Sequence, residues 1–325
     1  MRNYIIAFVI FIAVLFVIAL AIGQSNDTDD IEYVDEFVTA DETIEESIEK
    51  PIDEPIKEPI DEAQEQTPTS SSYDASAIEI PMATKAFPEQ ILVRVNYTTS
   101  YNKETKCPNW VAWHLEKDKT DGPCRREGVP YYDDDFNAYG IGKLSGNNVK
   151  GCYMVDLEAG PPRQEISDWY NIPPNTDHGH ICPAADNRWS KTTMNQSFLL
   201  TNICPQDRDL NAGDWAGLET RCRGWAKRYS DIYIVAGPIF YNGVSKTMGD
   251  NKVGVPDAFF KVILRLEKEP KVIGFIFPNN GIHHELKDYV LSVDEVEEVT
   301  GIDFFHNLPD DIENDIEKVS NLNEW

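Results

Sequence analysis

The sequence has few basic residues for its number of acidic ones. It contains 29 Lys and Arg against 56 Asp and Glu in 325 residues, a formal net charge of −27. A protein that binds nucleic acid tightly without regard to sequence needs a basic surface, so this deficit argues against tight non-specific binding of a polyanion. It does not exclude catalysis on a phosphate ester, for which positive charge is needed only at the reacting group.

Cysteines are also few, and none forms a Cys-x-x-Cys pair. All six lie between Cys107 and Cys222, which fits an exported domain that carries disulfides. Cys107 and Cys124 both fall in loop-like sequence, and we expect this pair to form a bridge. The other cysteines lie in or near predicted core elements, where a buried thiol acts as a small apolar residue.

The amino terminus carries the one long apolar run. Ile5 to Ile22 is almost unbroken Ile, Phe, Val, Leu and Ala, which approaches the roughly twenty residues that a membrane-spanning helix needs. Arg2 precedes the run and acidic residues follow it, so the bulk of the chain is predicted to lie outside the cytoplasm. Residues 1–23 are therefore a signal anchor, which would make the membrane a partner, or a signal peptide cleaved near Ala19 to Gln24, which would release a secreted protein.

Residues 24–76 concentrate the negative charge, with 18 Asp and Glu against two Lys. The repeat Pro51 to Glu62 has proline at every fourth position, which forbids a regular helix, and like charges favour an extended, disordered linker. Apolar residues return near Ile78, so we predict one globular domain over 77–325. This domain still has 26 basic and 38 acidic residues, although Asp177 to Arg228 has seven basic and six acidic ones.

The domain alternates short strands with a few helices. Asn109 to Leu115 is predicted to be a strand with Val111, Trp113 and Leu115 on one side and a structural His114 on the other. A Ser292-x-x-Glu295 capping box begins a helix that Gly301 ends. Further strands are expected at Ile91 to Val95, at Asp231 to Gly237 with a stop at Gly237-Pro238, and in a hairpin of Lys261 to Leu266 with Val272 to Phe277. The fold class is therefore α+β, with a mixed or antiparallel sheet flanked by helices.

Asp209 to Tyr229 shows the clearest helical period, with apolar residues at steps of three and four. Asn211, Trp215, Glu219 and Arg223 are each four residues apart, so they lie along one flank of this helix. One helix could thus carry several polar groups into one cleft. In the alternative interpretation, Asn211 has a structural role as the N-cap of this helix.

These residues have the chemistry for cleaving a phosphodiester. The reaction needs a base to activate water, positive charge for the transition state and help for the leaving alkoxide. A neutral His180 could take the proton of the water, Asn211 could anchor Mg²⁺ through its carbonyl oxygen, and Glu219 could hold metal-bound water. In the alternative reading His178, His180 and Cys182 bind zinc, although no second pair of ligands completes a tetrahedral set.

The same segment resembles the DNA/RNA non-specific endonuclease family, which has a ββα-metal fold. Its Asp-Arg-Gly-His motif corresponds to Asp177-His178-Gly179-His180, and its Thr-Asn-x-x-Pro-Gln-x-x-x-Leu-Asn run to Thr201 through Asn211. Trp215, Glu219 and Arg223 follow at the family's spacing. The resemblance extends over roughly residues 78 to 325.

The resemblance implies a role for each matching residue. His180 is the general base, Asn211 the direct ligand of Mg²⁺, with Mn²⁺ or another divalent cation as alternatives, and Glu219 the partner of metal-bound water. Asn202 and Arg223 support or contact the scissile region. The implied substrates are DNA and RNA.

This chain departs from the family at His178, where an arginine is usual. A neutral histidine lacks the bidentate fork with which arginine binds phosphate. Arg125, Arg126, Arg163 or Arg188 could compensate. Two other functions stay open, a membrane-tethered binding module without activity and a phosphodiesterase for small nucleotides.

Overall fold

The structure, a computed structural model, describes residues 77–131 and 153–325. The predicted signal segment (1–23), the acidic linker (24–76) and Cys152 lie outside these residues. Within the two described ranges, none of the helices combines the length and the apolar character that crossing a bilayer requires.

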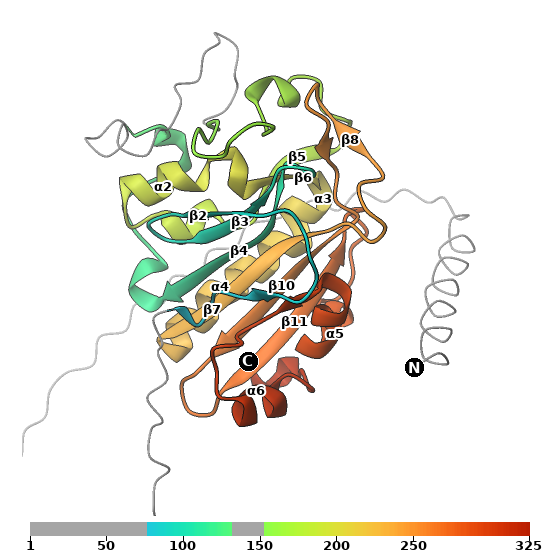
Figure 1. Ribbon diagram of the computed structural model, residues 1–325. Helices are drawn as coiled ribbons and strands as arrows, with labels where there is room; N and C mark the ends of the chain where they lie inside the picture. Colours follow the sequence, from blue (N-terminus) through green and yellow to red (C-terminus); the bar gives the residue numbers. More distant parts are fainter. Residues whose placement is uncertain (1–76, 132–152) are drawn as a thin grey trace, which may run out of the picture. The chain divides into compact units, whose positions relative to one another are not determined.

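A seven-stranded sheet in the order β12-β11-β10-β7-β4-β3-β2 forms the centre of the domain (Figure 1). Every neighbouring pair in it is antiparallel. Its strands are β2 (Gln90–Val93), β3 (Thr98–Asn102), β4 (Cys107–Glu116), β7 (Asp231–Ile239), β10 (Ala258–Arg265), β11 (Lys271–Pro278) and β12 (Val290–Leu291). The expected hairpin is confirmed as β10–β11, which pairs Arg265 with Lys271 at its turn.

The remaining elements are short, apart from one long helix. The helices are α2 (Lys191–Ser197), α3 (Arg208–Leu210), a π-helical turn (Asn211–Trp215), α4 (Ala216–Tyr229), α5 (Val293–Thr300) and α6 (Asp310–Ile316), and the short strands are β1 (Met82–Ala83), β5 (Thr176–His180), β6 (Ile203–Asp207), β8 (Thr247–Met248), β9 (Val253–Gly254) and β13 (Ile302–Asp303). Single turns of 3-10 helix connect several of them.

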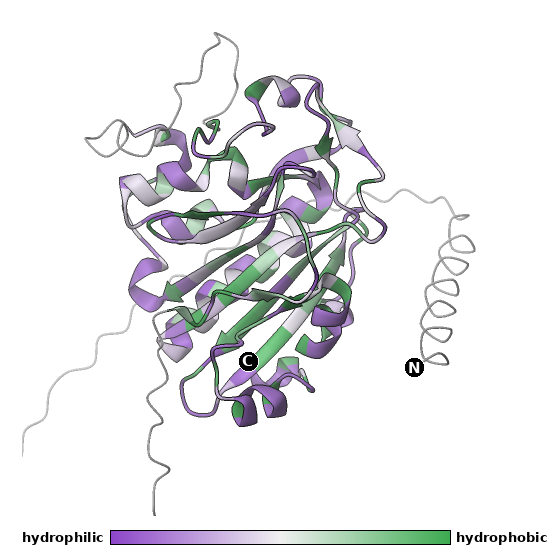
Figure 2. Ribbon diagram, in the orientation of Figure 1, coloured by the Kyte–Doolittle hydropathy of each residue, from purple (hydrophilic) through white to green (hydrophobic). Residues whose placement is uncertain are grey.

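Both faces of the central strands of the sheet are buried. Val111, Trp113 and Leu115 belong to one core cluster with the apolar stripe of α4, as their alternation predicted. Trp110 and Ala112 belong to a second cluster with α5 and the segment that follows it. The central strands are therefore nearly continuous apolar runs, as strands covered on both faces must be (Figure 2).

The predicted end of the strand at Gly237-Pro238 is wrong, because β7 continues to Ile239. Pro238 lies opposite Phe259 of β10. On the other side β4 pairs with β7 only as far as Ala236. Proline has no N–H, and it is tolerated at this position because no strand on that side needs the N–H as a hydrogen-bond donor.

The predicted bridge between Cys107 and Cys124 is also wrong. Cys107 is the first residue of β4, fully buried, and its thiol donates a hydrogen bond to the Gly254 carbonyl at 3.4 Å. The composition around Cys107 predicts a loop, but the residue pairs with Asn102 of β3.

The predicted capping box of α5 is confirmed. The Ser292 hydroxyl accepts from the Glu295 N–H at 3.2 Å, and the Glu295 carboxylate accepts from the Ser292 N–H at 2.8 Å. Gly301 ends the helix with φ of 72°, a left-handed conformation that glycine adopts at little cost.

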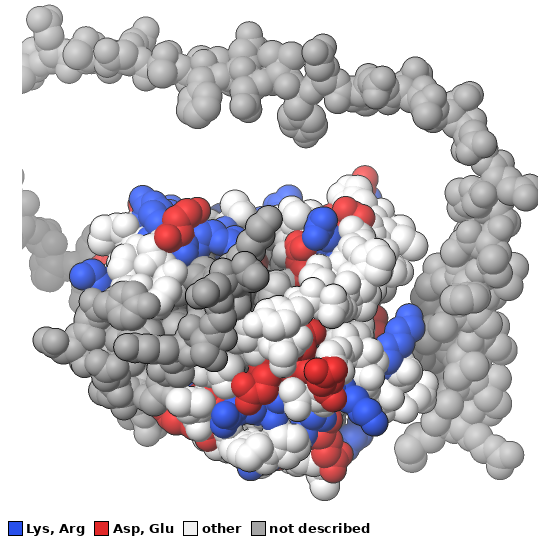
Figure 3. Space-filling model, turned by 90° about the horizontal axis from the view of Figure 1, so that it is seen from above, with Lys and Arg blue, Asp and Glu red and all other residues white. Residues whose placement is uncertain are grey.

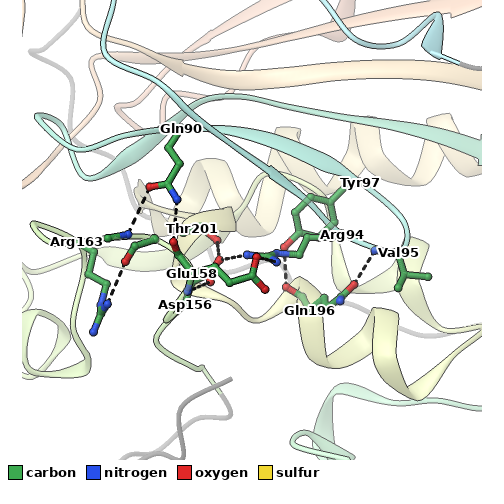
Figure 4. Close-up of polar contacts among 11 residues, drawn as sticks. Gln90, Arg94, Val95, Tyr97, Asp156, Glu158, Arg163, Gln196 and Thr201 are labelled. Carbon is green, nitrogen blue, oxygen red and sulfur yellow. Dashed lines mark hydrogen bonds and ion pairs between the residues drawn. The ribbon is translucent and has the colours of Figure 1, made fainter. Parts of the chain in front are cut away.

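A buried ion pair links Arg94, which directly follows the edge strand β2, to Asp156, in the segment that precedes the candidate site (Figure 4). The Arg94 guanidinium lies 2.6 Å from the Asp156 carboxylate, and both side chains are at most 2% exposed. The Thr201 hydroxyl donates to the same carboxylate at 2.6 Å. These contacts tie the segment that begins at Tyr153 to the turn that precedes β6.

Replacing Arg94 with methionine is expected to lower the free energy of unfolding by about 3–5 kcal/mol, because Asp156 would remain buried without its cation. Urea unfolding followed by tryptophan fluorescence measures the change. Arg163→Met is the matched control. Arg163 pairs with Glu165 at 3.1 Å near the surface, and such a pair contributes about 0–1 kcal/mol. Equal losses in both variants would contradict the assignment.

Candidate active site

The residues of the predicted motif form a ββα unit. β5 pairs antiparallel with β6, so that His178 lies opposite Pro205 and His180 opposite Ile203. The chain then enters α3, the π turn and α4 without a loop. The two halves of the motif are thus adjacent strands, and the helix that follows them carries Asn211 and Glu219.

Asn211 is not the N-cap of the helix, so that alternative is wrong. The cap is Asp207, whose carboxylate accepts from the Asp209 N–H at 2.9 Å. Asn211 lies one turn further on, at the start of the π turn, where Gly213 departs from helical geometry with φ −100° and ψ −106°. Single π turns inside helices often mark functional sites.

Gly179 is required by the way β5 packs on β6. A Cβ atom on this residue would come within 2.6 Å of the Gln206 Cβ and closer still to its amide oxygen. Gln206 is itself buried in strand β6. The glycine between the two histidines therefore allows the strands to approach.

Gly179→Ala is expected to displace β5 and with it His180. We expect a loss of about 1–3 kcal/mol of stability from overpacking together with a loss of any activity that depends on His180. Thermal unfolding and turnover, measured on the same preparation, test this. Gly217→Ala is the control, because a Cβ on this α4 residue meets nothing within 4 Å. A fully stable and active Gly179→Ala protein would refute the packing argument.

Four of the six predicted site residues line one cavity of about 900 Å³, namely His178, His180, Asn211 and Glu219. Asp177 of the same motif lines it too. Two strands and a helix thus bring a histidine, an amide and a carboxylate to a common surface. Asn202 and Arg223 do not line this cavity.

His180 has the arrangement of a general base. Its Nε2 atom is buried and has no hydrogen-bond partner among the described residues, whereas the ring makes a hydrogen bond with the backbone of His178. A neutral imidazole keeps one unprotonated nitrogen, which can accept the proton of a water molecule. Burial lowers the pKa of His180 to about 3, and the nearby charge of Arg126 adds to the effect. The ring is neutral at ordinary pH.

His178 cannot replace the family arginine as a cation. Its ring is stacked between Tyr153 and Trp169, at centroid distances of 4.1 and 4.0 Å. Burial lowers its pKa to about 4, although Asp177 acts in the opposite direction. His178 is thus a neutral, tightly packed wall of the cavity.

Three of the four arginines considered as compensation are found at the cavity. Arg125, Arg126 and Arg188 line it, whereas Arg163 does not. The Arg126 guanidinium lies over the Phe198 ring at 5.8 Å, and Arg188 pairs with the exposed Asp121 at 3.2 Å. On the face seen from above in Figure 1, basic and acidic side chains are interspersed (Figure 3). On this face the basic side chains do not form a broad basic surface.

The oxygen atoms of the cavity fit a hard divalent cation. The Asn211 amide nitrogen donates to the Asp177 carboxylate at 3.2 Å, which fixes the amide and leaves its oxygen as the ligand atom. Arg208 holds the same carboxylate at 3.0 Å. Burial raises the pKa of Glu219 to about 7, while the charge of Lys261 acts in the opposite direction. A carboxylate in such surroundings is stabilised by a nearby cation.

The alternative zinc site is wrong. His178 is confined between two aromatic rings, and the Cys182 sulfur accepts from the Asn187 amide at 3.4 Å. In residues 77–131 and 153–325, the one group of three or more potential ligands lies elsewhere.

Asn202 has a structural role in this arrangement. It is fully buried, and its amide donates to the carbonyls of Cys182 and Ser197 at 2.8 and 2.9 Å and accepts from the Cys182 N–H at 2.9 Å. These bonds fix the chain that leaves β5 directly after His180. Asn202 therefore fixes the backbone that directly follows His180.

Arg223 is likewise bound to the protein, 3.1 Å from the buried carboxylate of Asp186.

The motifs did not reveal one buried cation near the site, Lys261 of β10. Its side chain is 0% exposed, and the ammonium lies 4.2 Å from the Trp215 ring centroid and 5.3 Å from that of Trp113. The sequence did carry a sign of this buried cation, namely a lysine within a predicted strand that is otherwise apolar.

The comparisons with known proteins agree with this geometry. Residues 75–311 match the sequence model of the DNA/RNA non-specific endonuclease family. The mitochondrial nuclease EXOG of Xenopus laevis is 30% identical over 67% of this chain and 58% of its own length, and a nuclease of Nostoc sp. is 30% identical over 73% and 82%. The chain thus spans a little over half the length of the EXOG relative.

A solved complex of EndoG with EndoGI aligns with a TM-score of 0.56 and 21% identity, over 69% of this chain and 89% of that one. This likeness supports the ββα-metal fold. The match of the family model over most of the chain establishes that the chain belongs to the DNA/RNA non-specific endonuclease family.

Proposed function

We propose that the protein is a divalent-metal-dependent endonuclease that hydrolyses phosphodiester bonds of DNA and RNA without strong sequence preference. The observation that carries the proposal is the neutral His180, whose buried Nε2 has no partner among the described residues, beside Asn211 and Glu219 on one cavity. Family membership supports the substrate class.

In the proposed reaction, the unprotonated nitrogen of the neutral His180 ring takes the proton of the attacking water. Asn211, oriented by Asp177, would bind Mg²⁺, and Glu219 would complete the same oxygen-rich wall. The cation, when bound, would stabilise the charge that develops on the phosphate and the leaving oxygen. Arg126 and its neighbours at the cavity mouth would attract the phosphate, since His178 carries no charge.

The experiment compares plasmid DNA, long RNA and dinucleotides as substrates of the full-length protein in Mg²⁺, Mn²⁺ and EDTA. We expect cleavage of both polymers in either metal and none in EDTA. Cleavage of dinucleotides alone would indicate a small-nucleotide phosphodiesterase. Binding without cleavage would indicate an inactive module of the same fold, and activity in EDTA would refute the metal-dependent mechanism.

We further propose that the enzyme acts outside the cytoplasm, on the basis of the apolar run and the charges around residues 1–23. Fractionation of the cells that express it would find the full-length chain in the membrane if the segment is an anchor, and a shortened chain in the medium if it is cleaved. A full-length chain in the cytosol would contradict export.

A further inference from the structure

A group of carboxylates lies in the carboxyl-terminal part of the domain, apart from the cavity. Asp294 and Glu297 are three residues apart on α5, and Glu317 follows the last residue of α6. Each offers one oxygen, and these three oxygens all lie within 4.8 Å of one another. None of the three residues lines the candidate active site. We call this group the α5–α6 carboxylate cluster.

Glu317 distinguishes this cluster from an ordinary acidic surface. Its side chain is 6% exposed, and its Oε1 atom is buried with no hydrogen-bond partner among the described residues. The backbone fixes its position, since the Val293 N–H donates to the Glu317 carbonyl at 3.0 Å. A buried carboxylate oxygen without a donor is costly unless a cation or a proton satisfies it.

The surroundings of Glu317 supply like charge. Burial, together with the neighbouring carboxylates of Glu297, Glu313, Asp294 and Asp303, raises the pKa of Glu317 to about 9. The side chain of Glu297 is itself bound on one oxygen, Oε1, which accepts from the Phe304 N–H at 2.8 Å. Its other oxygen remains for a ligand.

We propose that Asp294, Glu297 and Glu317 bind one divalent cation, and that the cation is Ca²⁺. The donors are all carboxylate oxygens, whereas zinc favours histidine and cysteine. Ca²⁺ takes six to eight oxygens at about 2.3–2.6 Å, so two oxygens on opposite sides of it lie about 4.8 Å apart. Three carboxylates that bind through one or both oxygens, with water, supply such a shell. The ion would join α5 to the end of α6.

The test follows thermal unfolding of the full-length protein in EDTA and during titration with CaCl₂. We expect the melting temperature of the wild type to rise by several degrees with CaCl₂. Glu317→Gln should unfold in EDTA at about the temperature of the wild type, because the raised pKa of Glu317 leaves its side chain uncharged when no cation is bound, and should show no rise with CaCl₂. Cleavage at saturating Mg²⁺ should be unchanged in this variant, since the cluster is separate from the cavity.

Glu298→Gln is the matched control. It removes the same charge from an exposed neighbour on α5, and it should respond to CaCl₂ as the wild type does. Asp294→Asn, a change at an exposed ligand, should raise the half-saturating Ca²⁺ concentration at least tenfold without loss of folding. A wild type that shows no response to CaCl₂, or a Glu317→Gln protein that keeps the full response, would overturn the proposal and would indicate protonated carboxylates instead. Neither result bears on the nuclease proposal.

Discussion

Replacement of His180 by alanine is expected to reduce turnover by about 10²–10⁴-fold, the usual contribution of a general base. The reason is the neutral ring, which has one unprotonated nitrogen to accept the proton of the attacking water and whose Nε2 has no partner among the described residues. Measurement of plasmid cleavage in single and multiple turnover separates a lost base from lost binding. An active His180→Ala protein would refute the role.

The pH dependence gives a second readout of the same group. Because burial lowers the pKa of His180 to about 3, the ring is already in its neutral, active form at about pH 5 and stays so at higher pH. The wild-type rate should therefore show no acid limb from this histidine near its ordinary pKa of about 6.5. A limb near that pH, absent in His180→Ala, would show that the ring titrates normally.

The control for both measurements is His114→Ala. His114 is half-buried on β4, bonded to Asp231 at 2.9 Å and stacked on Tyr233. It is not among the residues that line the cavity. We expect this variant to keep full activity.

The second large effect is expected from Asn211→Ala. The half-saturating Mg²⁺ concentration should rise at least about tenfold, because even residues that only support a metal ligand commonly contribute that much. Activity lost at low Mg²⁺ should return in part at high Mg²⁺. A metal titration of the cleavage rate tests this, and an unchanged curve would count against the ligand role.

Two variants separate the ligand from its surroundings. Asn211→Asp keeps an oxygen donor at the same position, so it should retain metal-dependent activity. Asn175→Ala changes an exposed asparagine that bonds to Asp207 and Asp209 beside the motif. It should leave the Mg²⁺ curve unchanged, since Asn175 does not line the cavity.

Several features could be predicted from the sequence because they depend on residues close together in the chain. The capping box at Ser292 and the stop at Gly301 need only one helix. The strand alternation at Trp113 and the stripe of α4 follow from the periods of strand and helix. The ββα unit is also local, since β5, β6 and α4 lie within about fifty residues.

Other features were decided by contacts between distant segments. Cys107 lies in a paired strand because β3 and β4 meet, so local composition gave the wrong expectation of a bridge to Cys124. The aromatic rings around His178 come from two segments that precede β5, and Arg126 reaches the cavity from a loop far upstream. The spacing of residues along the chain does not predict which distant segments lie close together in the fold.

The sequence by itself determined the family motif, and with it the residues that we propose as the base and the metal ligand, since chemistry restricts which residue types can do this work. The tertiary structure decided the protonation and surroundings of those residues, because burial and neighbouring charge set the pKa of His180 and Glu219. It alone showed that Asn202 and Arg223 are bound within the protein, and that Glu317 meets Asp294 and Glu297. Each depends on packing between elements that are independent in sequence.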